Sequence, residues 1–396
     1  MCESSFVDTK LSDKLRWSWP WLLRYPFWRS RELLSSMTEP NEPRHLVFLV
    51  ANHFEPGLGT EALARLESWC KLARATGDAV RDHDGTPFRH TNFFPAEQYE
   101  RPILDVLAGL QSDGYGEVEI HLHHGVEGPD TAENTRRALE EFRDLLAQEH
   151  GCLSRGETDS SPRYAFVHGN WALANSAGGE FCGVDNEMQI LADTGCYADF
   201  TLPSVPFQSQ VPRINAIYQC GHALNQARPH RSGPNLKVGQ QPRLPIIFTG
   251  PLVFDWTRRI RGLPIPRIDD GALAQNYPLS LHRFDRWRSA RIGVHGRPEW
   301  HFIKLFSHGF FDWDQDIMIG EQLKRFMGEV MELAEQTGRF KIHFASAREA
   351  FNMVMAGVDG HKGNPNLYRD YRLRQIMKEV QTVPIGAEQD SPMMVG

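Results

Sequence analysis

Short apolar runs alternate with helical stretches along most of the chain. The run His45-Leu-Val-Phe-Leu-Val-Ala51 is apolar at successive positions, which is typical of a strand buried on both faces. Such runs predict strands at residues 45–51, 88–94, 117–123, 163–168, 197–201, 245–250, 301–306 and 340–344. Amphipathic patterns predict helices at residues 60–77, 103–110, 131–149, 187–194, 319–336 and 347–356. Alternation of this kind indicates a parallel sheet.

The number of strands favours an α/β barrel over a dinucleotide-binding sheet. The sequence contains no G-x-G-x-x-G and no Walker motif, so a nucleotide cofactor is not expected. We expect residues 45–360 to form the barrel, after an aromatic and basic arm with a linker at 1–44 and before a C-terminal tail at 361–396. Residues 202–300 are rich in Pro, Gly, Arg and Gln, which predicts long loops over the C-terminal face of the barrel.

The net charge, the cysteines and the apolar runs of the chain limit which partners and which cellular location are expected. The 396 residues carry a net charge of −7, and the basic runs are short, so nucleic-acid binding is not expected. The six cysteines form no C-x-x-C pair, which favours reduced thiols in a cytoplasmic protein. Neither a secretory signal pattern nor a run of about 18 apolar residues is present, so no membrane span is expected.

Residues 16–29 are unusual because four Trp, one Tyr and one Phe are interspersed with arginines. Such a segment suits the surface of a membrane, where aromatic rings and Arg are both favourable, and the protein would then be peripheral at the inner membrane. The alternative is an arm that packs across the barrel or against a partner protein. Two prolines interrupt a clean amphipathic helix here.

Histidines recur where predicted strands end. The first strand ends in Asn52-His-Phe-Glu55, the third in His121-Leu-His-His124, the fourth in His168-Gly-Asn-Trp171, and the seventh in Ser307-His308. In α/β barrels the C-terminal strand ends build the active site. These ends therefore predict one shared functional site.

Side-chain alternation places His121 and His123 on the same face of the third strand, so both can reach one ion. Imidazole and carboxylate ligands suit zinc and also iron, nickel or cobalt. The alternative is a pair of buried histidines bonded to carboxylates. A structural role also remains the alternative for His53, His168 and His308 taken singly. Asp185 and Glu187 precede a predicted helix, where they either cap it or contact substrate.

In their order, five motifs resemble the polysaccharide deacetylase superfamily (NodB-like, carbohydrate esterase family 4), in particular a bacterial branch associated with exopolysaccharide biosynthesis. They are Asn52-His-Phe-Glu-Pro56, Glu119-Ile-His-Leu-His-His124, Val167-His-Gly-Asn-Trp171, Gly195-Cys-Tyr-Ala-Asp-Phe-Thr-Leu-Pro-Ser204 and Phe302-Ile-Lys-Leu-Phe-Ser-His-Gly309. The resemblance implies a distorted (β/α)7 barrel. It also implies a metal held by an Asp of the first strand and by a His-x-x-x-His motif, and a later histidine that acts as acid.

This sequence departs from that pattern in two places. Asn52 and His53 stand where the family has an Asp pair, and the residue four after His123 is Glu127. The resemblance then leaves His121 or His124 to complete the metal site and matches His308 to the later histidine. Since Asn cannot act as a base, that role passes to Glu55, to His168 or to metal-bound hydroxide.

Together, the residues and the resemblance predict a metal-dependent hydrolase that removes acetyl groups from a saccharide or polysaccharide. The expected cofactor is a divalent metal, with zinc as the first candidate, on His53, His121, His123 and His124. Expected catalytic residues are Asn52, Glu55, His168 and His308. Expected substrate contacts are Phe54, Asn170, Trp171, Asp185 and Glu187. The alternatives are an inactive carbohydrate-binding or scaffold subunit of an exopolysaccharide assembly system, and a metal-dependent hydrolase of another C–N or glycosidic bond.

Overall fold

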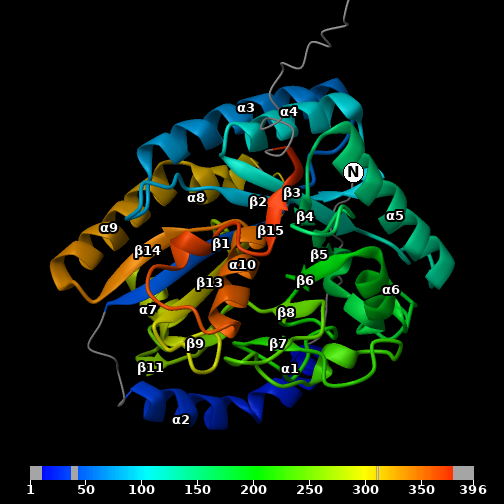
Figure 1. The fold of residues 1–396 in the computed structure, drawn as a ribbon. Helices are drawn as coiled ribbons and strands as arrows, with labels where there is room; N and C mark the ends of the chain where they lie inside the picture. The colour runs from blue at the N-terminus through cyan, green and yellow to red at the C-terminus, as the bar shows by residue number, and fades with distance from the viewer. Residues whose placement is uncertain (1–10, 37–42, 309, 311, 378–396) are drawn as a thin grey trace, which may run out of the picture.

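The computed structural model describes residues 11–36, 43–308, 310 and 312–377 (Figure 1). Within these residues, nine strands form one mostly parallel sheet in the order β13-β1-β2-β3-β5-β6-β8-β7, with β14 also paired to β1. The strands are β1 (Arg44–His53), β2 (His90–Pro95), β3 (Gly116–Leu122), β5 (Tyr164–His168), β6 (Cys196–Asp199), β7 (Ile217–Gln219), β8 (Ile246–Phe248), β13 (Trp300–His308) and β14 (Phe340–Phe344).

The central strand β1 has partners along both edges. β13 follows one edge from His45↔Trp300 to His53↔His308, while β14 and then β2 share the other edge. Because these strands are parallel, the C-terminal ends of β1, β2 and β13 lie at the same end of the sheet. All eight predicted strands are confirmed, but β7 runs antiparallel to β8, so the sheet is not parallel throughout.

Alternate residues of the strands enter two separate cores. Leu46, Phe48 and Val50 of β1 pack in the larger core, together with residues of the outer helices. Val47 and Leu49 pack in the second core with α10 (Ala347–Val358). All twelve residues of α10 are buried, and Figure 1 shows this helix in the middle of the curve that the strands form. Both faces of the sheet are covered, as the continuous apolar runs predict.

The helices of the larger core connect successive strands. They are α3 (Gly59–Ala79), α4 (Arg101–Ser112), α5 (Ala132–Glu149), α6 (Glu187–Thr194), α7 (Leu281–Ser289), α8 (Gln315–Ile319) and α9 (Glu321–Thr337). The six predicted helices are confirmed. The one predicted at 319–336 is preceded by α8, and Gly320 separates the two.

The N-terminal arm forms two helices, α1 (Leu11–Leu22) and α2 (Tyr25–Ser36), although it contains two prolines. Pro20 lies in the last turn of α1, and Pro26 is the second residue of α2, where its missing N–H is tolerated. Trp21 is buried and stacks on Phe254 at a centroid distance of 5.7 Å. The arm therefore packs against its own chain.

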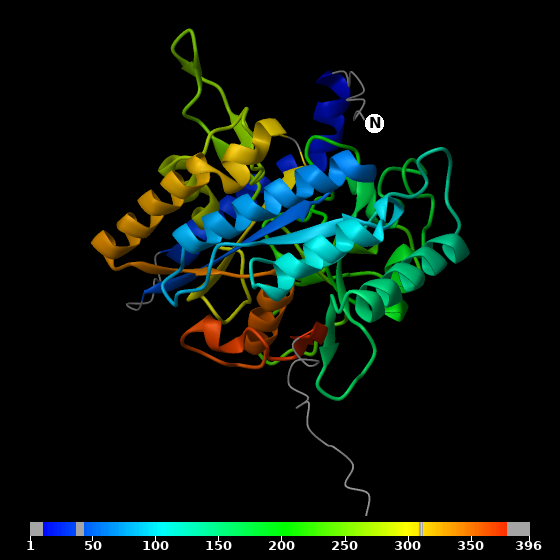
Figure 2. The same cartoon turned by 90° about the horizontal axis from the view of Figure 1, so that it is seen from above.

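Residues 202–300 contain more regular structure than the expected long loops. Besides β7, β8 and α7, the strand β9 (Val253–Asp255) pairs with β12 (Arg267–Asp269). Between these two strands, β10 (Arg259–Ile260) and β11 (Leu263–Pro264) form a hairpin, which projects on the same side as α1 in Figure 2. Within the expected C-terminal tail, β15 (Leu373–Gln375) pairs with β4 (Ser154–Gly156).

The fold is thus a mixed α/β fold built on a large sheet. Beyond β7, the hydrogen bonding continues through isolated bridges, Tyr218 with Asn235 and Lys237 with His295. Across the described ranges, no helix combines the length and apolar character needed to cross a bilayer.

Candidate metal sites at the strand ends

The histidines at the strand ends form two clusters. The first cluster consists of His53, Glu55 and His121, and the second consists of His124, His168, Cys182 and Glu187. In each cluster, one ligand atom per residue lies within 4.8 Å of those of the other members. His53 and His121 continue the alternation that faces α10, whereas His168 follows Phe166 toward the larger core with α5 and α6.

His121 is the best-defined ligand of the first cluster. Its Nδ1 lies 2.7 Å from the carbonyl oxygen of Val167, which can only accept, so Nδ1 carries the proton. The Nε2 atom is buried, has no hydrogen-bond partner within the described chain, and lies 3.4 Å from Oε1 of Glu55. Its lone pair therefore faces a carboxylate oxygen, an arrangement that needs a proton or a cation between them. This geometry fits a metal ligand.

His123 lies beside the first cluster and pairs with a carboxylate that the sequence did not indicate. Its Nδ1 is 2.5 Å from Oε1 of Glu97, and its Nε2 is 3.7 Å from Oε1 of Glu55. Burial lowers the pKa of His123, but the hydrogen bond and charge of Glu97 and the charge of Glu55 outweigh it, so the pKa is raised. The side chains of His123 and Glu55 are partly exposed, so this cluster is open on one side.

An aromatic pair borders the first cluster. The ring of Trp171 lies 6.4 Å from His53 and stacks on Phe207 at 4.6 Å. Asn170 and Trp171 have φ values of 53° and 56°, in the left-handed region that side chains rarely adopt. Strained backbone of this kind is often found at functional sites. Asn170 itself is exposed.

Asn52 and Phe54, which were expected to act at this site, are instead buried within the protein. Asn52 is buried, and its amide accepts from Ser307 at 2.8 Å and contacts Asn92 at 3.5 Å, which links the ends of β1, β13 and β2. Phe54 is completely buried in the larger core, edge-to-face with Trp69 and Phe310. The expected sugar contact of Phe54 therefore does not fit its position, because residues 53 and 54 point to opposite faces.

The second cluster is buried. His124 Nε2 lies 2.9 Å from His168 Nε2 and 3.0 Å from Oε1 of Glu187, and the last pair, His168 Nε2 and Glu187 Oε1, is 3.3 Å apart. Cys182 Sγ lies 3.7 Å from Oε2 of Glu187. The expected single site with His124 beside His123 is thus not what the structure shows, since the chain turns after Leu122 and His124 points toward α5 and α6.

The pKa values follow from these contacts. Burial raises the pKa of Glu187, but the charges and hydrogen bonds of His168 and His124 reverse this and hold it well below its ordinary value. Burial lowers the pKa of His124, but Glu187 and Asp130 outweigh it and raise the pKa overall. Burial keeps the pKa of His168 lowered and that of the Cys182 thiol raised. Glu187 is therefore a buried carboxylate.

Of the remaining predicted residues, Glu187 belongs to the second cluster, whereas the others lie apart from both clusters or have side chains outside the described residues. Asp185 is exposed and accepts from Asn175 at 2.6 Å. Glu187 begins α6, yet its carboxylate contacts two histidines and the backbone N–H of Ala174. β13 ends at His308, whose side chain is outside the described residues, and Glu127 is exposed.

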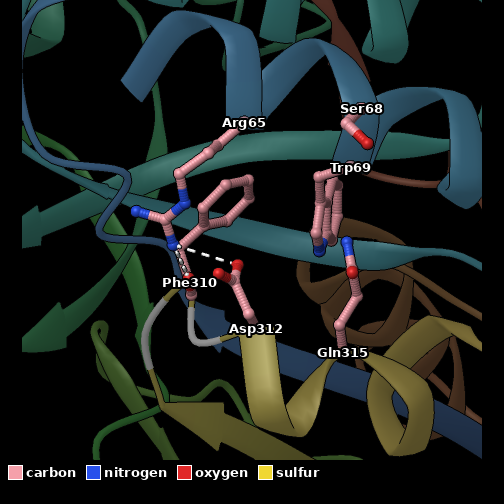
Figure 3. A pocket seen from close by; sticks show the side chains of 6 residues that line it. All are labelled: Arg65, Ser68, Trp69, Phe310, Asp312 and Gln315. Atoms are coloured by element: carbon pink, nitrogen blue, oxygen red, sulfur yellow. Dashed lines mark hydrogen bonds and ion pairs between the residues drawn. The ribbon is translucent and has the colours of Figure 1, made fainter. Parts of the chain in front are cut away.

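A surface pocket lies between α3 and the segment after β13 (Figure 3). It is lined by Arg65, Ser68, Trp69, Phe310, Asp312 and Gln315. Arg65 donates to the carbonyl oxygen of Phe310 and lies 3.4 Å from Asp312, so it closes one side. No histidine of either cluster lines this pocket, and we assign no chemistry to it.

No model of a protein family, no curated protein and no solved structure matches this chain. Sequence reasoning missed Glu97 and Cys182. Glu97 directly follows β2 in the helical turn Ala96–Gln98, so the rule that pointed to the other strand ends could have found it. Cys182 lies only five residues before Glu187, and a lone cysteine gives no spacing signal.

Proposed function

We propose that this protein is a metal-dependent hydrolase, with its metal held by the first cluster. The observation that carries the proposal is the buried Nε2 of His121. Among the described residues it has no hydrogen-bond partner, and it faces Glu55 while Val167 fixes the other ring nitrogen. Zinc is the first candidate among divalent metals, because the donors are imidazole nitrogens and a carboxylate oxygen. The partly exposed side leaves room for a substrate, as catalytic sites require.

The residues around the cluster have complementary roles. A divalent metal bound here would lower the pKa of a water ligand and polarise a carbonyl group. His123, oriented by Glu97, is placed to transfer a proton at its Nε2. The stacked rings of Trp171 and Phe207 form an apolar wall beside His53, suited to the face of a sugar ring.

We propose an acetylated saccharide or polysaccharide as substrate, on the basis of the motif resemblance to polysaccharide deacetylases. The same resemblance supports a distorted (β/α)7 barrel as the closed form of the observed sheet. Hydrolysis would then release acetate from an N- or O-acetyl group, and the sugar chain would stay intact. Mass spectrometry of the products separates this reaction from cleavage of a glycosidic bond or of another C–N bond.

The test uses untagged protein purified without chelators. We expect bound metal by inductively coupled plasma mass spectrometry, and release of acetate from acetylated oligosaccharides. His121→Gln should lose the metal of the first cluster and lower the rate at least about 100-fold. His90→Gln is the matched control, since His90 is equally buried but bonds to the carbonyl oxygen of Met318. An unchanged rate and metal content in His121→Gln would refute the proposal.

One observation favours a second candidate, a carbohydrate-binding subunit without turnover. Asn52 occupies the position of a family aspartate, and its amide is committed to Ser307 and Asn92. Saccharide binding without acetate release, measured over several metals, would select this alternative.

A further inference from the structure

The second cluster has more acceptors than donors. His124 Nδ1 lies 2.9 Å from Asp130 and His168 Nδ1 bonds to the carbonyl oxygen of Gly169, so each Nδ1 carries the proton of its ring. Both Nε2 atoms then present lone pairs, and they meet the carboxylate of Glu187 within 3.3 Å. Lone pairs from three residues converge inside the protein, where solvent cannot separate them.

The spacing matches the ligand shell of a small cation. For a tetrahedral zinc ion with bonds of about 2.0–2.1 Å to nitrogen, neighbouring ligand atoms lie about 3.3 Å apart. The three separations here are 2.9, 3.0 and 3.3 Å, and Cys182 Sγ offers a fourth ligand. A cation at this point would be bound by all four side chains, whereas without it the thiol of Cys182 donates to Oε2 of Glu187 at 3.7 Å.

The support around the cluster is also typical of a metal site. Asp130, which orients His124, also accepts from Thr135, and the backbone N–H of Ala174 bonds to the second oxygen of Glu187. The backbone N–H of Val184 lies 3.4 Å from the sulfur of Cys182. Each ligand is thus held by a further hydrogen bond, an arrangement that raises metal affinity.

A fifth buried residue, His230, lies close enough to this cluster to feel the charges of Glu187 and His168. Neither ring nitrogen of His230 has a hydrogen-bond partner within the described chain, and the side chain is buried. The pKa of His230 is lowered to about 4, mainly by burial. The charge of Glu187 opposes this shift, and the charges of Arg228 and His168 add to it.

We propose that the second cluster binds a divalent transition-metal ion, with zinc as the first candidate. The site would be closed and structural, because its four ligand side chains are buried. The ion would join the ends of β3 and β5 to α6, whose first residue is Glu187, and to the segment before it. This site is separate from the first cluster and does not depend on its activity.

The experiment removes the first cluster and counts what remains. In untagged His53→Gln/His121→Gln protein, we expect one equivalent of metal per chain. Adding Glu187→Gln should weaken binding at least about 100-fold, while adding His90→Gln should leave the equivalent in place. A chain without the first cluster that carries no stoichiometric metal would overturn the proposal.

Cobalt substitution supplies a measurement that does not depend on the folding of Glu187→Gln. Cobalt bound at the second cluster should show thiolate charge-transfer absorption in the near ultraviolet, because Cys182 is a ligand. Cys182→Ser should abolish this band, and Cys220→Ser, the change of another buried free cysteine, should keep it. Absence of the band, or its survival in Cys182→Ser, contradicts the four-residue site.

A second, independent observation concerns the outer face of the N-terminal helices. Four apolar residues spaced four apart are exposed: Leu15 (58%) and Trp19 (60%) of α1, Leu23 (53%) in the turn between the helices, and Phe27 (80%) of α2. The opposite face is packed, because Trp21 and Tyr25 contact Phe254. The exposed stripe is therefore not the face that attaches the helices to the protein.

A hairpin on the same side of the molecule also exposes apolar and basic side chains. Trp256 packs beside Phe254 at 5.9 Å, and the hairpin exposes Ile260 and Leu263. Figure 2 shows α1 and the hairpin projecting on one side of the molecule. We call this the apolar–basic surface; it consists of Leu15, Arg16, Trp19, Leu23, Arg24, Phe27, Trp256, Arg258, Arg259, Ile260, Arg261 and Leu263, all of them exposed.

We infer that the apolar–basic surface binds an anionic lipid bilayer. The chain has a net charge of −7, yet residues 12–30 and 256–266 expose five arginines, and their one acidic residue, Asp13, is half-buried. Interspersed Trp, Leu and Arg side chains suit the boundary between headgroups and acyl chains, where the rings and stems are buried and the guanidinium groups contact phosphate.

The test is sedimentation with vesicles of phosphatidylcholine alone and of equal parts phosphatidylcholine and phosphatidylglycerol. We expect binding to the anionic vesicles only, lowered at least about tenfold by Trp19→Ser/Phe27→Ser. Leu58→Ser/Leu367→Ser, which changes exposed apolar residues elsewhere, is the control and should bind as the wild type does. Failure to bind anionic vesicles, or a dimer in solution that Trp19→Ser/Phe27→Ser dissociates, would overturn the inference.

Discussion

Glu97 holds Nδ1 of His123 at 2.5 Å, and Nε2 of the same ring lies 3.7 Å from Glu55. The pair comes from two neighbouring strand ends, since Glu97 follows β2 and His123 follows β3. A carboxylate at Nδ1 fixes the tautomer and the orientation of the ring, and thereby the position of the proton at Nε2.

Glu97→Gln tests this orienting role. An amide keeps the size of the side chain but removes the charge, so we expect kcat to fall about 10–100-fold with little change in KM. The metal content should stay at the wild-type value, because Glu97 does not belong to the first cluster. Glu140→Gln, on the exposed face of α5, is the control. A loss of metal in Glu97→Gln would instead make Glu97 a ligand.

The strands could be predicted because a continuous apolar run indicates a strand that is buried on both faces. Their polar ends could be predicted because the polar residues begin where each run stops. Alternation within β3 correctly separates His121 from Leu122, and the same parity places Phe54 in the core beside Phe48 and Val50. The division of the histidines into two clusters could not be predicted, because the turn after Leu122 sends His124 toward α5 and α6. The contact between Asp130 and His124 depends on where the helices lie, which the local sequence does not determine.

Asp130→Asn tests the support of the second cluster. Asp130 accepts from His124 Nδ1, and several hydrogen bonds hold its pKa low despite partial burial, so it is a carboxylate at neutral pH. The amide loses the charge that orients the ring, and we expect metal affinity at this cluster to fall about 10–100-fold. Competition with a chromophoric chelator measures the affinity. Asp185→Asn, an exposed acid nearby, should leave the affinity unchanged, and equal effects of both substitutions would argue against the assignment.

The two faces of α1 should differ in their contribution to stability. Trp21 is 1% exposed and stacks on Phe254. Trp21→Ala should therefore lower the free energy required to detach α1 and α2 from the protein by about 3 kcal/mol or more. Trp19 is largely exposed, and Trp19→Ala should cost less than about 1 kcal/mol. Amide hydrogen exchange of residues 11–36 measures the opening. Similar exchange in both variants would mean that the arm does not pack as the structure shows.

Glu119 should make the stability of the protein depend on pH. Its carboxyl group is buried below the first cluster and accepts from the hydroxyl of Tyr197 at 2.5 Å and from the N–H of Ala165 at 2.6 Å. Burial raises its pKa from 4.5 to about 8, although both hydrogen bonds oppose the shift. Between these two pH values the folded chain keeps a proton that the unfolded chain releases.

Stability from this proton is therefore fully present below pH 4.5 and is lost as the pH rises toward 8, by at most about 1.4 kcal/mol per unit. Glu119→Gln carries no such proton, yet its amide can still accept from Ala165 and donate to the Tyr197 oxygen. Denaturant unfolding at a series of pH values should show the free energy of the wild type falling relative to that of Glu119→Gln up to about pH 8, then running parallel. Asp199, whose pKa is raised to about 7, titrates in both proteins and cancels in the difference. Parallel curves over the whole range would show that Glu119 is ionised in the folded protein, held by Tyr197 and Ala165 against the cost of burial.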